Sequence, residues 1–279
     1  LPEHFKILFD NIIEKNPALK DIMKKNSDAR NRELISYGRT DFSIRDITQE
    51  EFALLYNYYN MRKQYSAARS LFENHGNWFR DAVRNVSGRV VFCDLSYESS
   101  ASGMAFMDIC RSYRHTDMNY IGVHPIYELS EISRSFLEDE SYKHAKASFY
   151  PRITAIKDNF WSVHSILPEL VIFNLSSIFD RISPLEARHL AVQINQIAHA
   201  HPLNHYILIY RDDAGERMNI NSYRAFCCSL SKIFAKLNEK MPVYAKFYYN
   251  QQNDKLNAAD SCSGNPEYGS FIYEIISNR

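Results

Sequence analysis

Hydrophobic side chains recur at intervals of three and four residues through the first part of the chain, the spacing of one face of an α-helix. Asn16 followed by Pro17 has the sequence of a helix N-cap and first helical position, and Thr48 with Glu51 forms a capping box. The first hydrophobic stripe consists of Phe5, Leu8, Phe9, Ile12 and Ile13. Residues 1 to about 85 are therefore predicted to be mostly helical.

After Gly88 the pattern changes to short apolar runs that alternate with helical segments. A β-branched run at 89–95 is followed by a small-residue stretch at 99–103 and an apolar helix from Met104. A second strand at 119–123 ends before a proline, and a helical spacing follows at 128–137. This order predicts strand, turn and helix twice in succession.

The remaining elements continue the alternation and then end on two strands. Strands are expected at 169–175 and 206–210, followed by helices at 183–199 and 223–237, and two last strands at 243–249 and 270–276. Alternating strands and helices predict a mostly parallel sheet with helices on both faces, and the last two strands predict an antiparallel hairpin. The expected organisation is a helical extension at 1–87 and an α/β domain at 88–279.

Charge and cysteine content narrow the class of protein. Lysine plus arginine and aspartate plus glutamate number 33 each, so no overall basic field exists to hold nucleic acid. The five cysteines form no C-x-x-C pair, which argues against a disulfide framework or a structural zinc site. No apolar run approaches the ~20 residues that span a bilayer. These features predict a cytoplasmic protein without membrane contact.

The stretch 90–103, VVFCDLSYESSASG, resembles motif I of the class I S-adenosylmethionine (SAM)-dependent methyltransferases, which reads roughly V-x-D-x-G-x-G-x-G. Asp94 stands where the family has its strand-end acid, and Gly103 stands where the next helix packs closely. Ser96 and a serine-rich loop replace the turn glycines, which normally let the backbone approach the cofactor without a Cβ in the way. Side chains in this turn are expected to crowd a cofactor pocket.

The stretch 120–125, YIGVHP, is similar to the second-strand motif of the same family. The resemblance implies an acidic residue at the strand end that accepts hydrogen bonds from the ribose hydroxyls, and this position holds His124. A neutral imidazole accepts one hydrogen bond and does not supply an anionic, bidentate acceptor. The substitution predicts a lower affinity for SAM.

Two further stretches complete the resemblance. Residues 153–159 resemble the third-strand end that places an acidic or amide side chain beside adenine, which implies a role for Asp158 or Asn159. Residues 170–177 occupy the fourth-strand position, where amino-group methyltransferases carry Asn/Asp-Pro-Pro-aromatic, and only Asn174 matches. This departure argues against methylation of exocyclic amines.

The resemblance implies a Rossmann-like methyltransferase fold and a SAM site formed by six residues: Asp94, Ser96, Gly103, His124, Asp158 and Asn174. Because most motif positions differ, we expect a pseudoenzyme whose SAM site is reshaped or lost and which binds a protein partner or a second copy of itself. One alternative is an active SAM-dependent methyltransferase with an atypical motif I. Another is a nucleic-acid-binding module that uses the tyrosine-rich helical extension. SAM is the only cofactor implied, and no catalytic residue is predicted.

Two smaller groups of residues have either a functional or an ordinary structural role. The serine-rich loop at 96–102 either presents amides to an anion at a helix N-terminus or closes an empty cofactor pocket. Four histidines lie close in sequence, but no carboxylate or cysteine stands at ligand spacing, so a metal site is not expected. They are His189, His199, His201 and His205.

Overall fold

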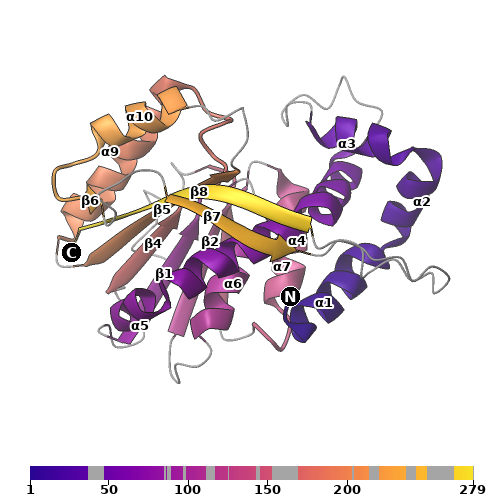
Figure 1. The fold of residues 1–279 in the computed structure, drawn as a ribbon, viewed down its shortest axis with the longest axis horizontal. Helices are drawn as coiled ribbons and strands as arrows, with labels where there is room; N and C mark the ends of the chain where they lie inside the picture. The colour runs from indigo at the N-terminus through magenta and orange to yellow at the C-terminus, as the bar shows by residue number, and fades with distance from the viewer. Residues whose placement is uncertain are drawn as a thin grey trace.

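The computed structural model describes most of the chain and contains a twisted sheet with helices on both faces (Figure 1). The described residues are 1–36, 47–84, 86, 89–96, 99–110, 117–124, 126–142, 145–152, 169–202, 204–213, 220–236, 243–249 and 267–278. No helix in these ranges is long and apolar enough to cross a membrane.

The first part of the chain is helical, as the sequence predicts. Its elements are α1 (Glu3–Phe9), the π-helix η1 (Asp10–Glu14), α2 (Pro17–Lys25), α3 (Asp28–Ser36), α4 (Gln49–Asn74) and α5 (Gly76–Arg84). The predicted caps are present: Asn16 accepts a hydrogen bond from the Ala18 amide, and Thr48 and Glu51 form a reciprocal capping box. The starts of α2 and α4 are therefore determined by local side-chain chemistry.

The second part alternates strands and helices before two final strands. Its elements are β1 (Arg89–Asp94), α6 (Ala101–Cys110), β2 (Asp117–Val123), α7 (Tyr127–Leu137), β3 (Ala145–Tyr150), β4 (Leu170–Asn174), α9 (Pro184–Ala200), β5 (His205–Asp213), α10 (Ile220–Ser229), β6 (Ala235–Lys236), β7 (Val243–Tyr249) and β8 (Glu267–Ser277). A Ser183–Glu186 capping box starts α9.

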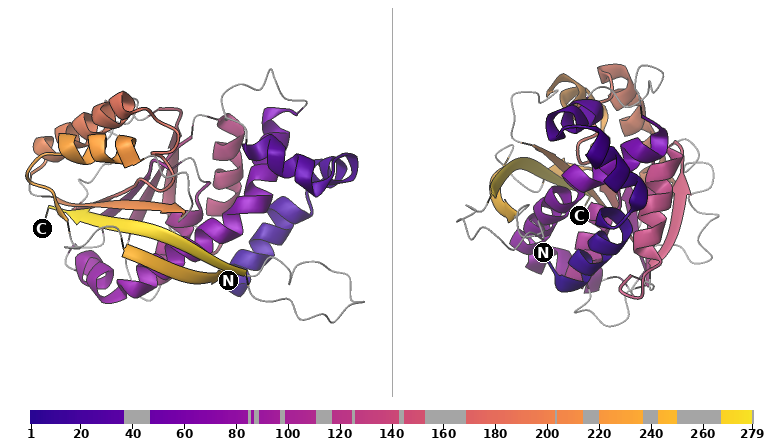
Figure 2. Two further views of the ribbon diagram at one scale, coloured as in Figure 1. Left: turned by 45° about the horizontal axis from the view of Figure 1, so that its top comes forward. Right: turned by 90° about the vertical axis from the view of Figure 1, so that its right-hand side faces the viewer.

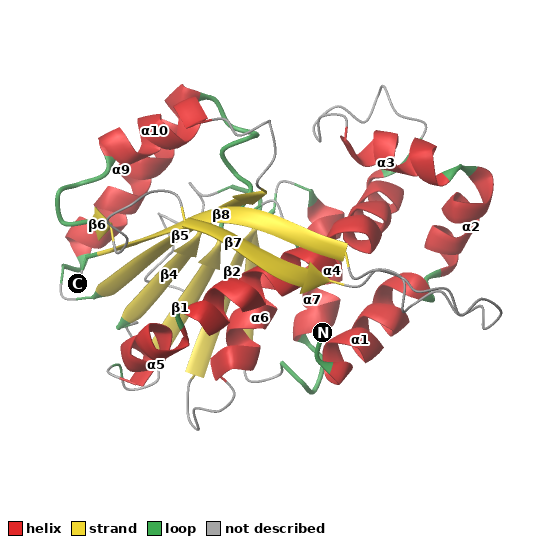
Figure 3. Cartoon of the chain, viewed as in Figure 1, coloured by secondary structure: helices red, strands yellow, loops and turns green. Residues whose placement is uncertain are grey.

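The described strands form one sheet in the order β3-β2-β1-β4-β5-β8-β6, with β7 also paired to β8. The first five strands of this order are parallel, and β8 is antiparallel to β5, β6 and β7. The carboxyl ends of β1, β2 and β4 therefore lie at one edge (Figure 3). This arrangement confirms the predicted mostly parallel sheet and its antiparallel C-terminal pair.

Two hydrophobic layers cover the two faces of the sheet. One contains the helical extension together with α6 and α7, and the other contains α9 and α10. Figure 2 shows α9 and α10 on the opposite side of the sheet from α5 and α6. The extension thus shares a continuous core with the sheet. The proposed division at residues 87 and 88 falls outside the described residues and stays a prediction.

Two sequence predictions need correction. The helix expected at 223–237 ends at Ser229, because Asn195 on α9 binds both sides of the chain reversal. Its Nδ2 donates to the Ser229 carbonyl and its Oδ1 accepts from the Ser231 amide, each at 2.8 Å. The third strand, which the resemblance placed with its end at 153–159, is β3 and ends at Tyr150; its half-buried side chains, some of them polar, gave no clear strand pattern.

Candidate functional site

The polar residues predicted at the strand ends meet in a buried network around Asp94, whose side chain is inaccessible to solvent. Its Oδ1 accepts hydrogen bonds from Asn174 Nδ2 at 2.9 Å, from the Ser96 amide at 3.2 Å and from the Ser96 hydroxyl. Its Oδ2 accepts from the Tyr120 hydroxyl at 3.1 Å. A carboxylate offers about four lone-pair sites. All four donors therefore come from the protein itself.

The network connects the ends of three neighbouring strands. Asp94 ends β1, Asn174 ends β4, and Tyr120 reaches across from β2. The Ser176 hydroxyl donates to Asn174 Oδ1 at 2.6 Å, which orients the amide so that its nitrogen points to Asp94. The predicted residues Asp94, Ser96 and Asn174 are thus brought together. Tyr120 was not predicted as a member, because its spacing in the sequence indicates only a buried strand position.

The serine-rich turn after β1 is held between two helices. The Ser99 hydroxyl donates to Oδ1 of Asn57 on α4, whose Nδ2 in turn donates to the Ala53 carbonyl at 2.8 Å. The Ser100 amide donates to the hydroxyl of Ser133 on α7 at 3.2 Å. Both serines are fully buried. The described part of the turn is therefore packed against the protein, with side chains where the resembling family has glycines.

Gly103 on α6 lies against the ring of Tyr120, at the position where close packing of the helix is predicted. A Cβ added there would lie 2.5 Å from Cε2 and 2.8 Å from Cδ2 of Tyr120. The same tyrosine donates to Asp94, so its ring has little freedom to move away. The absence of a side chain at Gly103 thus allows the close packing of helix and strand that the sequence comparison implied.

His124 follows β2 but its side chain is inaccessible, and it stacks on Phe149 with ring centroids 5.9 Å apart. Neither ring nitrogen has a hydrogen-bond partner among the described residues. Burial lowers the pKa of the imidazole to about 4, so the ring is neutral at neutral pH. The position that holds an acid in the resembling family therefore presents no charge.

Asp158, the predicted neighbour of adenine, lies outside the described residues, and its role stays a prediction. The histidines considered as metal ligands are not brought together: His189 lies near the start of α9 and His199 near its end. His205 begins β5 and hydrogen-bonds Ser277 at 2.9 Å. Within the described ranges no group of three metal-ligating side chains occurs.

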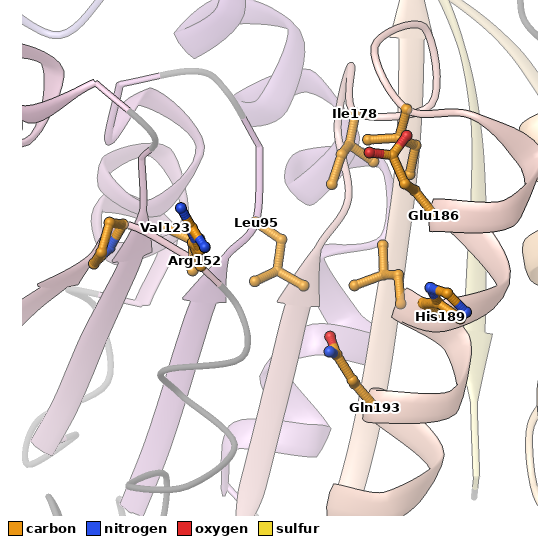
Figure 4. A pocket seen from close by; sticks show the side chains of 10 residues that line it. Leu95, Val123, Arg152, Ile178, Glu186, His189 and Gln193 are labelled. Atoms are coloured by element: carbon orange, nitrogen blue, oxygen red, sulfur yellow. The ribbon is translucent and has the colours of Figure 1, made fainter.

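A cavity of about 550 Å³ lies over the carboxyl ends of β1 and β2, at the point where the strand order reverses. Ligands of open α/β sheets lie at such a point. Figure 4 shows Arg152 and Val123 on one side, Leu95 between, and side chains of α9 on the other. The lining consists of Leu95, Val123, Pro151, Arg152, Ile178, Ile182, Glu186, His189, Leu190 and Gln193.

Sequence analysis did not identify the polar part of this lining. Glu186, His189 and Gln193 share one face of α9, at positions i, i+3 and i+7. The Glu186 carboxylate accepts from the Ser183 amide at 2.7 Å and the Ser183 hydroxyl at 2.8 Å, and these bonds lower its pKa. The repeat of polar residues along a helix that borders the strand ends was the available signal.

The fold and the strand-end site define a class of protein. The described strands have the arrangement of a Rossmann-like α/β fold of the class I methyltransferase type. Five parallel strands stand in the order 3-2-1-4-5, the last strand is antiparallel and lies beside the fifth, and a polar turn precedes the first helix that follows a strand. No family model and no curated protein sequence matches the chain.

Several solved structures are similar to this chain. One is the O-methyltransferase TomG from Streptomyces achromogenes, in complex with SAM, at 9% identity, a TM-score of 0.38, and coverage of 78% of this chain and 89% of TomG. A SAM-dependent methyltransferase from Agrobacterium tumefaciens has 8% identity and a TM-score of 0.42, over 75% of this chain and 62% of that protein. A precorrin-6y C5,15-methyltransferase from Geobacter metallireducens has 7% identity and a TM-score of 0.39, over 68% and 78%.

Proposed function

We propose that this methyltransferase-like protein does not hold SAM in the manner of its fold class and acts by binding a partner. The observation that carries the proposal is the burial of Asp94 together with its four hydrogen bonds from Ser96, Asn174 and Tyr120. The carboxylate is inaccessible to solvent, so the ammonium group of the cofactor could reach it only by displacing the side chains that surround it. Binding SAM there would first require breaking bonds in a buried network, which is costly.

The residue after the second strand supports the same proposal. His124 is buried, neutral and turned toward Phe149, while the side chain of Val123 faces the cavity. The ribose hydroxyls would therefore meet an aliphatic surface at this strand end instead of a carboxylate. The residues present at this strand end do not fit the nucleoside.

Exposed apolar side chains on α9 and α10 support a binding role. Leu185 is 61% exposed, Val192 on the same helix is 44% exposed, and Ile220 at the start of α10 is 38% exposed. Single exposed apolar residues are common, but Leu185 and Val192 are seven residues apart and so share a helix face. Light scattering over a range of concentrations, with Leu185→Asp as a variant, tests whether a second copy occupies this face.

The decisive experiment for the proposal is calorimetric titration of the folded chain with SAM and with S-adenosylhomocysteine. We expect no saturable heat with either compound. A dissociation constant in the micromolar range for either one would refute the proposal. A known SAM-binding methyltransferase titrated in the same buffer is the positive control, and circular dichroism establishes that the titrated chain is folded.

The alternative is an active SAM-dependent methyltransferase, and the cavity at the strand ends favours it. Its volume of about 550 Å³ falls within the range of ordinary small-molecule sites. Methyl transfer from a sulfonium depends mainly on alignment, so the absence of a predicted base does not exclude it. Under this alternative SAM binds, and Leu190→Trp, which places an indole in the cavity, abolishes binding.

A further inference from the structure

The cavity beside the serine-rich turn that follows β1 has the features of a separate ligand site. Its floor and one wall are apolar, formed by Leu95 and Val123 at the strand ends and by Ile178, Ile182 and Leu190 around α9. Sites for small molecules combine such an apolar lining with a few placed polar groups. The polar groups here are Arg152, Glu186, His189 and Gln193.

Gln193 supplies a polar group that the protein leaves unsatisfied. Its side-chain oxygen is buried and has no hydrogen-bond partner among the residues that the structure describes. A buried amide without a partner costs free energy, and a ligand that hydrogen-bonds it recovers that cost. Because a glutamine amide donates at one atom and accepts at the other, rotation of the group suits either kind of ligand atom.

Arg152 gives one wall of the cavity a group that binds anions. Arg152 lies on the side opposite α9 (Figure 4) and pairs with no described carboxylate. Glu186 is the one carboxylate in the lining, and its oxygen accepts two hydrogen bonds from Ser183 at the helix cap. SAM carries a sulfonium and an ammonium against a single carboxylate. Glu186 stays ionised on the α9 side, so the guanidinium on the opposite wall is the group with which an acidic ligand would pair, and SAM offers it only one carboxylate.

We propose that this cavity binds an anionic amphipathic small molecule, with its apolar body against Leu95, Val123 and Leu190 and its acidic group at Arg152. A guanidinium pairs with carboxylate, sulfonate and phosphate groups alike through two parallel hydrogen bonds. The inference rests on the proposed function only in that SAM is not the occupant. It concerns the space between the strand ends and α9, and not the closed turn.

The test uses two fluorescent dyes that differ in charge. Anilinonaphthalene sulfonate has an aromatic body and an acidic group, and phenylnaphthylamine has the same aromatic body without the acid. We expect the native protein to bind the sulfonate at one saturable site, and to bind the neutral dye about fivefold more weakly. Arg152→Gln should remove this difference by weakening the sulfonate alone.

Variants that fill the cavity show where the dyes bind. Leu190→Trp should weaken both dyes by at least about tenfold, which corresponds to 1.4 kcal/mol. Ile182→Trp fills the same cavity from a partly exposed position and serves if Leu190→Trp does not fold. Val192→Trp is the matched control, because this residue of α9 is 44% exposed and does not line the cavity. It should leave both affinities unchanged.

Three outcomes would overturn the proposal: no saturable sulfonate binding, binding that survives in both folded cavity-filling variants, or equal affinities for the two dyes. Displacement of the sulfonate by micromolar SAM would also overturn it, and would support the active methyltransferase instead. A protein that binds neither SAM nor the sulfonate retains the proposed function and loses this inference. The two ideas therefore fail separately.

Discussion

Gly103→Ala is a direct probe of how closely α6 packs on β2. The new Cβ would lie 2.5 Å and 2.8 Å from two ring carbons of Tyr120, whereas Phe92 Cδ1 is at an ordinary 3.6 Å. Tyr120 is held by its hydrogen bond to Asp94 and by stacking on Phe92, with centroids 6.3 Å apart. The ring therefore cannot relieve the overlap without loss of other contacts.

The expected cost follows from two opposing contributions. Forcing an extra methyl group into a packed core costs about 1–3 kcal/mol. Replacing glycine by alanine inside a helix returns up to about 1 kcal/mol through propensity. Because both contacts are shorter than 3.0 Å, the packing cost lies toward its upper end, and we expect Gly103→Ala to lower the free energy of unfolding by about 2 kcal/mol. Urea unfolding followed by circular dichroism, with linear extrapolation to water, measures this difference.

Gly76 provides the matched control. It begins α5, and a Cβ added there would meet no atom within 4 Å. Gly76→Ala should be neutral or slightly stabilising. In a Tyr120→Leu background the Gly103→Ala substitution should lose most of its cost, because the opposing ring is gone. If Gly103→Ala alone is as stable as the native protein, the close packing inferred from the structure is incorrect.

Two buried titratable groups give predictions of pH dependence. Burial lowers the pKa of His124 from 6.5 in the unfolded chain to about 4 in the folded chain. As the pH falls, the unfolded chain therefore takes up a proton first, and up to about 3 kcal/mol of stability is lost between these two pH values. His124→Phe retains a ring beside Phe149, and thermal unfolding at several pH values should show a weaker loss; an unchanged profile would contradict the assignment. Burial raises the pKa of Glu274 from 4.5 to about 8, although Lys236 Nζ lies 3.0 Å away. Between these pH values the carboxyl group keeps its proton in the folded chain and releases it in the unfolded chain. Stability therefore falls as the pH rises through this range. Glu274→Gln should remove that fall and be more stable than the native protein at pH 8, and equal slopes with pH for both proteins would count against it.

The fold could be predicted to the extent that local chemistry determines it. The caps at Asn16, Thr48 and Ser183 are interactions within three residues, and each is present where the sequence places it. The end of α10 could not be found in the same way, because the residue that stops the helix is Asn195, on another helix. Helical spacing in the sequence continues past Ser229, but the Asn195 side chain, which is distant in sequence, binds the backbone groups at the end of the helix.

The candidate site shows the same division. Asp94 and Asn174 were identified from their positions at strand ends, and parallel pairing brings them together: β1 and β4 align Asp94 with Asn174. The contribution of Tyr120 could be found only from the structure. Its register partner on β1 is Phe92, but its hydroxyl donates to Asp94, two positions further along β1. A register of strands specifies neighbours, but the direction of a long side chain depends on what packs around it.

The helical extension and the closed turn are one structural feature. Asn57 on α4 accepts a hydrogen bond from Ser99 in the turn, so the extension fixes the position of this serine side chain. A second contact connects α1 with α6: His4 Nε2 lies 3.0 Å from Asp108 Oδ1. The Tyr142 hydroxyl also donates a hydrogen bond to this carboxylate, at 3.1 Å. Because the extension also contributes to the core under the sheet, removing it would expose apolar surface along with opening the turn. Truncation of the extension would therefore not test the serine-rich turn alone, since the helices that contact the turn also contribute to the core under the sheet.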